Sequence, residues 1–407
     1  MLTWYLAVAL LQAVVSLQAL HLVLPLGGAL LARRWPPAPV PVAPPLRLAV
    51  LIAAHNEARV LGGALASLAR QTHPAAAFDV FVVADHCTDD TAAVARRTGA
   101  TVLERQGEGT RTKGAALRDL WAAVRPLGHA GVVILDADNH ADPGLLAALS
   151  DALAAGHRAI QGLRRARSGG GGTAGLDALT EACTHRIGAA GRARLGLGGP
   201  LMGSGMAFEA HTFDRLVTAV AATVVEDCAW QAELALRDVA VHWTADAVVE
   251  DEKTRTAASM ATQRNRWLTG RAQVARRYVG PLLARFARRG SWLALDAALG
   301  LTALPRSVLA AAVATCAAVA LLLPGLPGWW PAGWWGGLGL SLAAYVVAGV
   351  WLDGGTLTDT RPWASLLRHG PRFAWQMARA SWLAARGRQV AWLPTPHGPG
   401  EAPARRP

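Results

Sequence analysis

Two carboxylates one residue apart, Asp136 and Asp138, directly follow an apolar run over residues 131–135. Such a run predicts a strand buried on both faces, and open α/β sheets bind ligands at the carboxyl ends of their strands. Hard divalent cations such as Mg²⁺ are held by a few carboxylate oxygens together with substrate phosphates. The pair therefore predicts a metal–diphosphate site, although a polar strand end leading into a turn explains the same residues.

Two further predicted strands lead into acidic residues. The apolar run over residues 48–54 precedes Glu57, and the run over residues 80–84 precedes Asp85. Because the carboxyl ends of parallel strands meet at one edge of a sheet, we expect Glu57 and Asp85 to lie near Asp136. Helix capping and turn formation would account for Glu57 and Asp85 without any ligand.

The positions of these strands predict the fold class. Strands alternate with helices from Arg47 onward, with helical spacing over residues 58–70, 89–97 and 112–124. This alternation indicates βαβ units and therefore an α/β fold with a mainly parallel sheet. No Gly-x-Gly-x-x-Gly follows the first strand, which argues against a dinucleotide-dependent oxidoreductase.

A second acidic pair, Glu226-Asp227, follows the apolar residues Val224 and Val225 and opens a predicted helix. A carboxylate at a helix start often only complements the helix dipole. The same position suits a general base, and we assign that role to Asp227 with Glu226 as its positioning partner. Lys113, one of two lysines, precedes a helix and suits a phosphate contact; a solvated surface lysine is the alternative.

A predicted helix over residues 257–277 carries Gln263, Arg266 and Trp267 on one face, because these positions are related as i, i+3 and i+4. An arginine there can fork onto phosphate, and a tryptophan can stack on a sugar or close an acceptor channel. An amphipathic helix lying on anionic lipid is a compatible explanation. The glycine run over residues 168–172 predicts a flexible loop and no phosphate cradle.

Composition restricts the partners. The 407-residue chain has a net charge of +12, which comes almost entirely from arginine. A basic balance suits anionic lipid, a phosphorylated substrate or nucleic acid. We exclude nucleic acid, because the arginines cluster beside apolar segments and no nucleic-acid-binding module is recognised. Four scattered cysteines fit neither a disulfide framework nor a zinc site and suit a reducing compartment.

The amino end predicts a membrane helix. Residues 1–31 contain no charged side chain and exceed the length that spans a bilayer. Arg33 and Arg34 follow, so the positive-inside rule places the next segment in the cytoplasm. Residues 32–46 form a proline-rich spacer, and residues 47–290 form a cytoplasmic domain.

The carboxyl third returns to the membrane. Within residues 291–352 we expect an interfacial segment over 291–304 and two spans, over 306–323 and 334–352. Arginines and tryptophans interleave in residues 353–407, which predicts a basic amphipathic cytoplasmic tail on the lipid headgroups. The chain is thus expected to be a multi-pass protein of the cell (inner) membrane.

Seven motifs occur in order over about residues 48–277. They are Ala54-His55-Asn56-Glu57, Ala84-Asp85 with Thr88-Asp89-Asp90-Thr91, Lys113-Gly114, Asp136-Ala137-Asp138, Gly203-Ser204-Gly205-Met206, Val225-Glu226-Asp227, and Gln263-Arg264-Asn265-Arg266-Trp267. Together they resemble the motifs of the family 2 inverting glycosyltransferases, and the last one fits Gln-x-x-Arg-Trp, a signature shared with cellulose, chitin and hyaluronan synthases.

The resemblance implies a GT-A-like nucleotide-sugar-binding domain and a set of roles. Glu57 and Asp85 would bind the base and ribose of a UDP-sugar, and Lys113 would bind its phosphates. Asp138, with Asp136 beside it, would hold Mg²⁺ or Mn²⁺. Gly203, Ser204 and Gly205 would form the acceptor side, where Asp227 is the base; Gln263, Arg266 and Trp267 complete the substrate site.

The resemblance also implies a hexosyl- or N-acetylhexosaminyltransferase that acts on a polysaccharide or lipid-linked acceptor. Three spans are few for a polymer channel, so polymer translocation would require a homo-oligomer. The alternative from another class is a non-catalytic nucleotide-sugar-binding protein or assembly scaffold of a polysaccharide synthase. Loss of either acidic pair would favour the scaffold, and both pairs are present.

Overall fold

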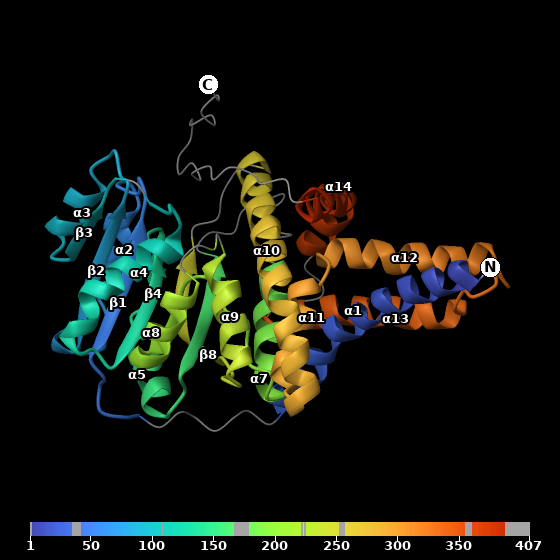
Figure 1. Ribbon diagram of the computed structural model, residues 1–407, viewed down its shortest axis with the longest axis horizontal. Coiled ribbons are helices and arrows are strands. Elements are labelled where there is room, and N and C mark those ends of the chain that lie inside the picture. Colours follow the sequence, from blue (N-terminus) through green and yellow to red (C-terminus); the bar gives the residue numbers. More distant parts are fainter. Residues whose placement is uncertain are drawn as a thin grey trace.

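The computed structural model describes residues 2–34, 42–107, 109–166, 179–220, 223, 225–251, 257–354 and 360–386. Its centre is an eight-stranded sheet with the order β3-β2-β1-β4-β7-β6-β8-β5 (Figure 1). The strands are β1 Leu48–Ala54, β2 Phe78–Asp85, β3 Thr101–Arg105, β4 Gly131–Asp136, β5 Asn139–Ala141, β6 Ala159–Ala166, β7 Met206–Glu209 and β8 His242–Asp251.

The first half of the sheet is parallel, as the sequence predicts. Strand β1 pairs with β2 and with β4, and β2 pairs with β3. The register sets Ala54 opposite Ala84, and Ala53 opposite Asp136. The polar residues that end β2 and β4 therefore lie along one edge of the sheet, on either side of the end of β1.

The second half of the sheet corrects the prediction of a mainly parallel sheet. Strand β7 is antiparallel to β4 and to β6, and β5 is antiparallel to β8; only β6 and β8 pair in parallel. The sheet is therefore mixed. A strand that is buried on both faces has the same apolar run whichever way its neighbour points, so the run does not predict strand direction.

Helices cover both faces of this sheet. One face carries α2 Leu61–Leu68, α3 Thr91–Arg97 and α5 Leu145–Ala154. The other carries α4 Lys113–Val124, α8 Ala210–Ala219 and α9 Glu226–Leu236, with α10 Ala257–Arg289 and α11 Trp292–Thr302 packed beyond α9. Figure 1 shows α10 and α11 standing between the sheet and the apolar helices at the other end of the molecule.

Helix starts agree with the sequence in part. The Thr112 hydroxyl accepts the Ala115 amide at 3.1 Å, and α4 begins at Lys113 as predicted. The cap of α3 is Asp90, so this helix begins two residues after the start of the helical spacing at residue 89. Asp89 still contributes, because its Oδ1 accepts the Thr91 amide at 3.0 Å. The glycine run at 168–172 lies outside the described residues.

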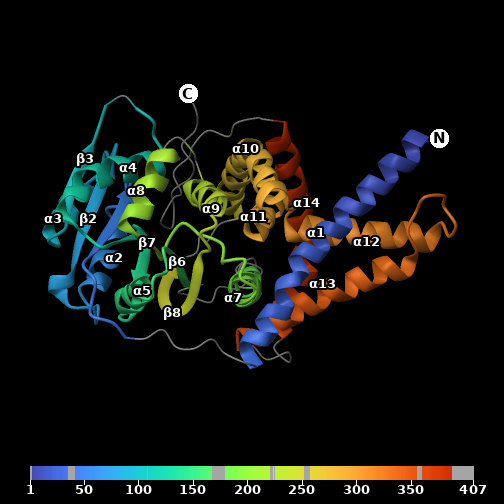
Figure 2. The same ribbon diagram turned by 60° about the horizontal axis from the view of Figure 1, so that its bottom comes forward.

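A bundle of apolar helices extends away from the sheet, as Figure 2 shows. It contains α1 Leu2–Arg34, α12 Arg306–Leu322 and α13 Ala332–Leu352, which pack on one another. Helices α1 and α13 are each long and apolar enough to cross a membrane, whereas α12 qualifies only together with α11 across an 82° bend. The predicted span over residues 306–323 is thus the second arm of a bent pair, whose first arm is the predicted interfacial segment.

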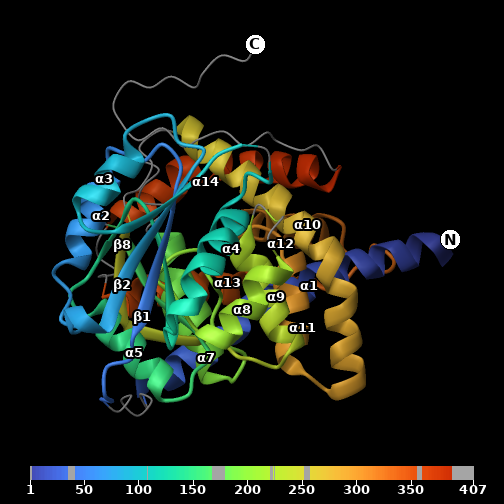
Figure 3. The ribbon, with the colours of Figure 1, turned by 60° about the vertical axis from the view of Figure 1, so that its left-hand side comes forward.

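Two further segments join the bundle to the domain. The π-helix η3 Cys183–Ala189 continues into α7 Ala190–Arg194, and both pack against α1. Helix α14, Thr360–Ala385, lies against α10 and α12 (Figure 3). Trp375 and Trp382 on α14 are exposed, as is Leu367.

Candidate active site

The side chain of Lys113 joins three segments of the candidate site. Its Nζ atom donates to a carboxylate oxygen of Asp136 at the end of β4 and, at 2.7 Å, to the carbonyl of Gly203. The same atom lies 3.3 Å from Oε1 of Glu226, the first residue of α9. One ammonium group therefore brings the strand-end carboxylate and the second acidic pair together.

Burial and charge shift the titration of this cluster. Burial and the neighbouring Glu226 carboxylate together raise the pKa of Asp227 to about 7, while the hydrogen bond from the Cys228 amide and the Lys113 ammonium oppose the shift. Burial alone would lower the pKa of Lys113, but the carboxylates of Asp136 and Glu226 raise it above its ordinary value. A carboxylate with a pKa near neutrality has the property that a general base requires.

The loop before β7 brings backbone close to both acids. Gly203 and Gly205 have φ angles of +82° and +64°, in the left-handed region that favours glycine. A Cβ on Gly203 would lie 3.4 Å from Oδ2 of Asp227. Between them, the buried Ser204 hydroxyl accepts the Asp136 amide at 3.0 Å. Gly203 and Ser204 therefore border the acids, whereas the Gly205 amide donates to the Ile134 carbonyl at 3.0 Å.

Helix α10 closes another side of the cluster. Burial lowers the pKa of Arg266, and the nearby carboxylates of Glu226 and Asp136 oppose this shift. Trp267 is 57% exposed. The side chain of Gln263 lies outside the described residues. Arg266 therefore lies near the acids, and the substrate roles of Gln263, Arg266 and Trp267 stay predictions.

The residues at the end of β4 suit a divalent cation only with help from a substrate. Asp136 and Asp138 supply two carboxylates, and no group of three or more acidic, histidine or cysteine side chains suited to a metal occurs among the described residues. Mg²⁺ or Mn²⁺ bound by one or two carboxylates completes its shell with substrate phosphates and water. The donor set fits such a metal–diphosphate arrangement.

A neighbouring pair was missed by the sequence reasoning. Asp251, at the end of β8, accepts from Arg164 at 2.6 Å, and Arg164 also donates to the carbonyl of Met202. The Asn139 amide lies 3.0 Å from Oδ1 of Asp138 and 3.5 Å from Oδ1 of Asp251. The available signal was that Asp251 follows an apolar strand, as Asp136 does.

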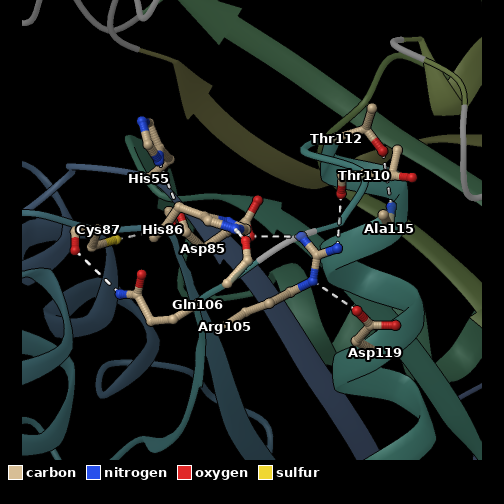
Figure 4. Close-up of polar contacts among 12 residues, drawn as sticks. His55, Asp85, His86, Cys87, Arg105, Gln106, Thr110, Thr112, Ala115 and Asp119 are labelled. Atoms are coloured by element: carbon tan, nitrogen blue, oxygen red, sulfur yellow. Dashed lines mark hydrogen bonds and ion pairs between the residues drawn. The ribbon is translucent and has the colours of Figure 1, made fainter.

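Asp85 forms a separate network, shown in Figure 4. Its Oδ1 accepts from Nδ1 of His86 and from Arg105, each at 2.7 Å, and Arg105 also binds Asp119 at 2.7 Å. An open pocket of about 520 Å³ adjoins this network and is lined by His86, Thr88, Gln106, Gly107, Gly109 and Arg111.

Glu57 lies at the same sheet edge, after β1. Its backbone amide donates to the Thr91 hydroxyl at 2.8 Å, and its carbonyl accepts the amides of Val60 and Leu61. The backbone of Glu57 therefore starts the turn into α2. This agrees with turn formation, the explanation of Glu57 that requires no ligand. A substrate role for its side chain stays a prediction.

Comparison with known proteins gives the family. Residues 44–270, more than half of the chain, match the family model described as "Glycosyltransferase like family 2". The chain belongs to this family. No curated protein sequence matches it significantly. The match includes every predicted site residue from Glu57 to Trp267 and ends before α11, so the apolar helices lie outside it.

Solved structures agree on the fold of this family 2 glycosyltransferase. The mannosyltransferase PcManGT from Pyrobaculum calidifontis, in complex with GDP-Man and Mn²⁺, is similar at 20% identity and a TM-score of 0.55. The similarity covers 92% of this chain and 97% of that one.

Weaker similarities involve two other proteins. S. aureus TarS is 13% identical over 84% of this chain and 55% of its own, with a TM-score of 0.43. Glucosyl-3-phosphoglycerate synthase from Mycobacterium tuberculosis, in complex with Mn²⁺, UDP and glucosyl-3-phosphoglycerate, is 19% identical over 59% of this chain and 80% of its own. Its TM-score is 0.39.

Proposed function

We propose that this protein is a membrane-bound inverting glycosyltransferase that uses a UDP-sugar and Mg²⁺ or Mn²⁺. The observation that carries the proposal is the position of Lys113, which contacts Asp136 and lies beside Glu226. A donor diphosphate at Asp136 and an acceptor hydroxyl at Asp227 would then be neighbours. Inverting transfer requires that arrangement, because the acceptor attacks the carbon from which the diphosphate leaves.

The proposed chemistry takes place at Asp227, on the acceptor side of the cluster, and around Asp136, on the donor side. Asp227 takes the proton of the acceptor hydroxyl, and its pKa of about 7 leaves it largely ionised just above neutral pH. Lys113 and Arg266 present positive charge to the departing diphosphate. A cation held by Asp136 and Asp138 would neutralise charge on the same leaving group.

The Asp85 network supports uracil as the base. Both side-chain bonds to this carboxylate end on Oδ1, and no residue in the described part of the chain bonds to Oδ2. One acceptor oxygen suits the single N3–H of uracil, whereas the N1–H and N2–H₂ edge of guanine is matched by both oxygens of a carboxylate. His86 and Arg105 thus favour a UDP-sugar over a GDP-sugar.

The acceptor is proposed from the surroundings of the site. Helix α10 packs against α9, which begins with the acidic pair, and against α11 and α14, and α14 exposes Trp375 and Trp382. An acceptor that reaches Asp227 from the membrane side would be a lipid-linked or growing glycan. This placement supports membrane attachment and a cytoplasmic catalytic domain, and it agrees with the resemblance to polysaccharide synthases.

The deciding experiment compares wild type with Asp227→Asn, using a panel of radiolabelled UDP-sugars and membranes that supply the acceptor. We expect Mn²⁺-dependent UDP binding to survive in the variant while transfer falls on the order of 10²–10⁴-fold. Near wild-type transfer would refute the role of Asp227. Wild-type protein that binds UDP but transfers no sugar would favour a nucleotide-sugar-binding scaffold.

A further inference from the structure

Arg271 on α10 closes the end of another helix. Its guanidinium donates to the carbonyls of Gly300, Leu301 and Ala303, the last two at 3.2 and 2.7 Å. These carbonyls belong to the last turn of α11 and the residue after it, and α12 begins three residues further on, at Arg306. The last four carbonyls of a helix lack partners within it, and the forked guanidinium binds two of them here, those of Gly300 and Leu301.

The carbonyls that Arg271 binds lie at the bend between α11 and α12, which meet at 82°. Burial lowers the pKa of Arg271. Within the described residues no carboxylate pairs with it, so its donors are committed to the bend. An arginine that served only solubility would instead lie exposed on the surface.

Gly270, the residue before Arg271, packs against the segment that leads into the acidic pair. A Cβ on Gly270 would lie 2.9 Å from both Cγ atoms of Val225, so α10 approaches Val225 as closely as glycine permits. Val225 directly precedes Glu226 and Asp227. Burial raises the pKa of the thiol of Cys228, the residue after Asp227, to about 12, so this thiol reacts slowly as long as the segment stays packed. One turn of α10 therefore packs against Val225, the residue before the acidic pair, and also binds the carbonyls at the bend.

We propose that Arg271 is a positioning residue that couples the α11–α12 bend to the acidic pair. This inference rests on the transferase activity proposed above. By holding α10 at the bend, Arg271 fixes the positions of Val225 and Arg266 relative to Asp227. The rate of sugar transfer should therefore depend on the position of the bend relative to the membrane. A displacement of about 1 Å at the reacting groups is enough to cost on the order of 10²-fold in rate.

The test uses the full chain in lipid nanodiscs and three variants, Arg271→Gln, Arg271→Lys and Arg288→Gln. Arg288 lies exposed near the end of the same helix, so its substitution removes the same charge without touching the bend. We expect Arg271→Gln to bind UDP with Mn²⁺ within about twofold of wild type while kcat falls on the order of 10- to 100-fold. Arg271→Lys should recover part of kcat, because an ammonium still donates to carbonyls.

A second readout is independent of turnover. Modification of Cys228 by N-ethylmaleimide, located by peptide mass spectrometry, should become faster in Arg271→Gln and stay at the wild-type rate in Arg288→Gln. Equal kcat and equal Cys228 labelling in Arg271→Gln and Arg288→Gln would overturn the proposal. Parallel loss of UDP binding and kcat in both Arg271 variants would overturn it too, since that result indicates general unfolding.

The outcomes separate this inference from the proposed function. A wild-type protein that binds UDP without transfer contradicts the transferase, and the Cys228 labelling then decides alone whether Arg271 fixes the acidic segment. A wild-type protein with transfer, and an Arg271→Gln variant with unchanged kcat, leaves the transferase in place and removes the coupling.

Discussion

Nζ of Lys113, on α4, lies 3.3 Å from Oε1 of Glu226, on α9, although the two residues are more than a hundred positions apart in the chain. The ammonium also binds Asp136 and the Gly203 carbonyl. It is therefore the shared counter-ion of the proposed donor site and the proposed base. A change at this one atom should affect both donor binding and proton transfer.

Replacing Lys113 tests this double role. In Lys113→Met we expect UDP to bind about 10- to 100-fold more weakly, because a hydrogen bond to a charged group contributes about 1.5–3 kcal/mol. The pH at which transfer begins should also rise, since Lys113 lowers the pKa of Asp227. Lys113→Arg should restore much of both, as measured by calorimetry and by pH–rate profiles. Unchanged UDP affinity in Lys113→Met would contradict the phosphate contact.

The pH dependence of transfer should follow Asp227. Because burial raises its pKa to about 7, kcat/KM should rise with pH through about 7 and then level off. Asp227→Asn should remove this rise from whatever transfer remains. A wild-type profile that is flat from pH 5 to 8 would contradict the assignment of the base.

The same shift has a consequence for stability, with the opposite sign to that of an ion-paired aspartate. The folded-state pKa of about 7 lies above the ordinary value of 3.8, so the folded protein holds a proton that the unfolded chain releases in between. The contribution of Asp227 to the free energy of unfolding should therefore fall as pH rises from about 4 to 7. Thermal unfolding of wild type and Asp227→Asn across this window measures it, and the difference between them should change in favour of the variant.

The strands that carry the donor side could be predicted because each is buried on both faces. Leu48–Ala54 and Gly131–Asp136 are continuous apolar runs, and polar residues follow them at once. Strand β5 has three residues and no such run, and β8 begins with partly buried residues, so neither was predicted. The mixed half of the sheet depends on pairings between distant segments.

The candidate site likewise contains residues that the sequence predicted and residues that it did not. Asp136, Lys113, Glu226 and Asp227 were recognised by their positions at strand and helix ends, and the structure brings them together. The bond from Arg164 to Asp251 joins residues 87 positions apart, which spacing alone does not indicate. The bond from Arg105 to Asp85 forms because β2 pairs with β3, and the sequence does not indicate that pairing.

Membrane topology gives an independent prediction. Reporter fusions after Arg34 and after Arg388 should both report the cytoplasm, and a fusion at Gly328, between α12 and α13, should report the outside. The arginines in the last turn of α1 and those after α13 favour this orientation. A cytoplasmic signal at Gly328 would contradict the span formed by α12 and would make α11 and α12 a segment that enters and leaves on one side.

The metal assignment is tested by Asp138→Ala with Asp246→Ala as its control. Asp138 has a fixed place at the end of β4, where the Asn139 amide donates to it at 3.0 Å, whereas Asp246 is exposed on β8. Each substitution removes one negative charge, so a general effect of charge on UDP binding would appear in both.

If Asp138 helps to hold the cation between protein and diphosphate, Mn²⁺ should strengthen UDP binding in wild type and in Asp246→Ala but not in Asp138→Ala. Binding of UDP without Mn²⁺ should stay similar in all three, because base and ribose contacts lie elsewhere on the sheet edge. Calorimetric titration with and without Mn²⁺ measures this difference, and an undiminished Mn²⁺ effect in Asp138→Ala would return that residue to a turn-forming role after β4.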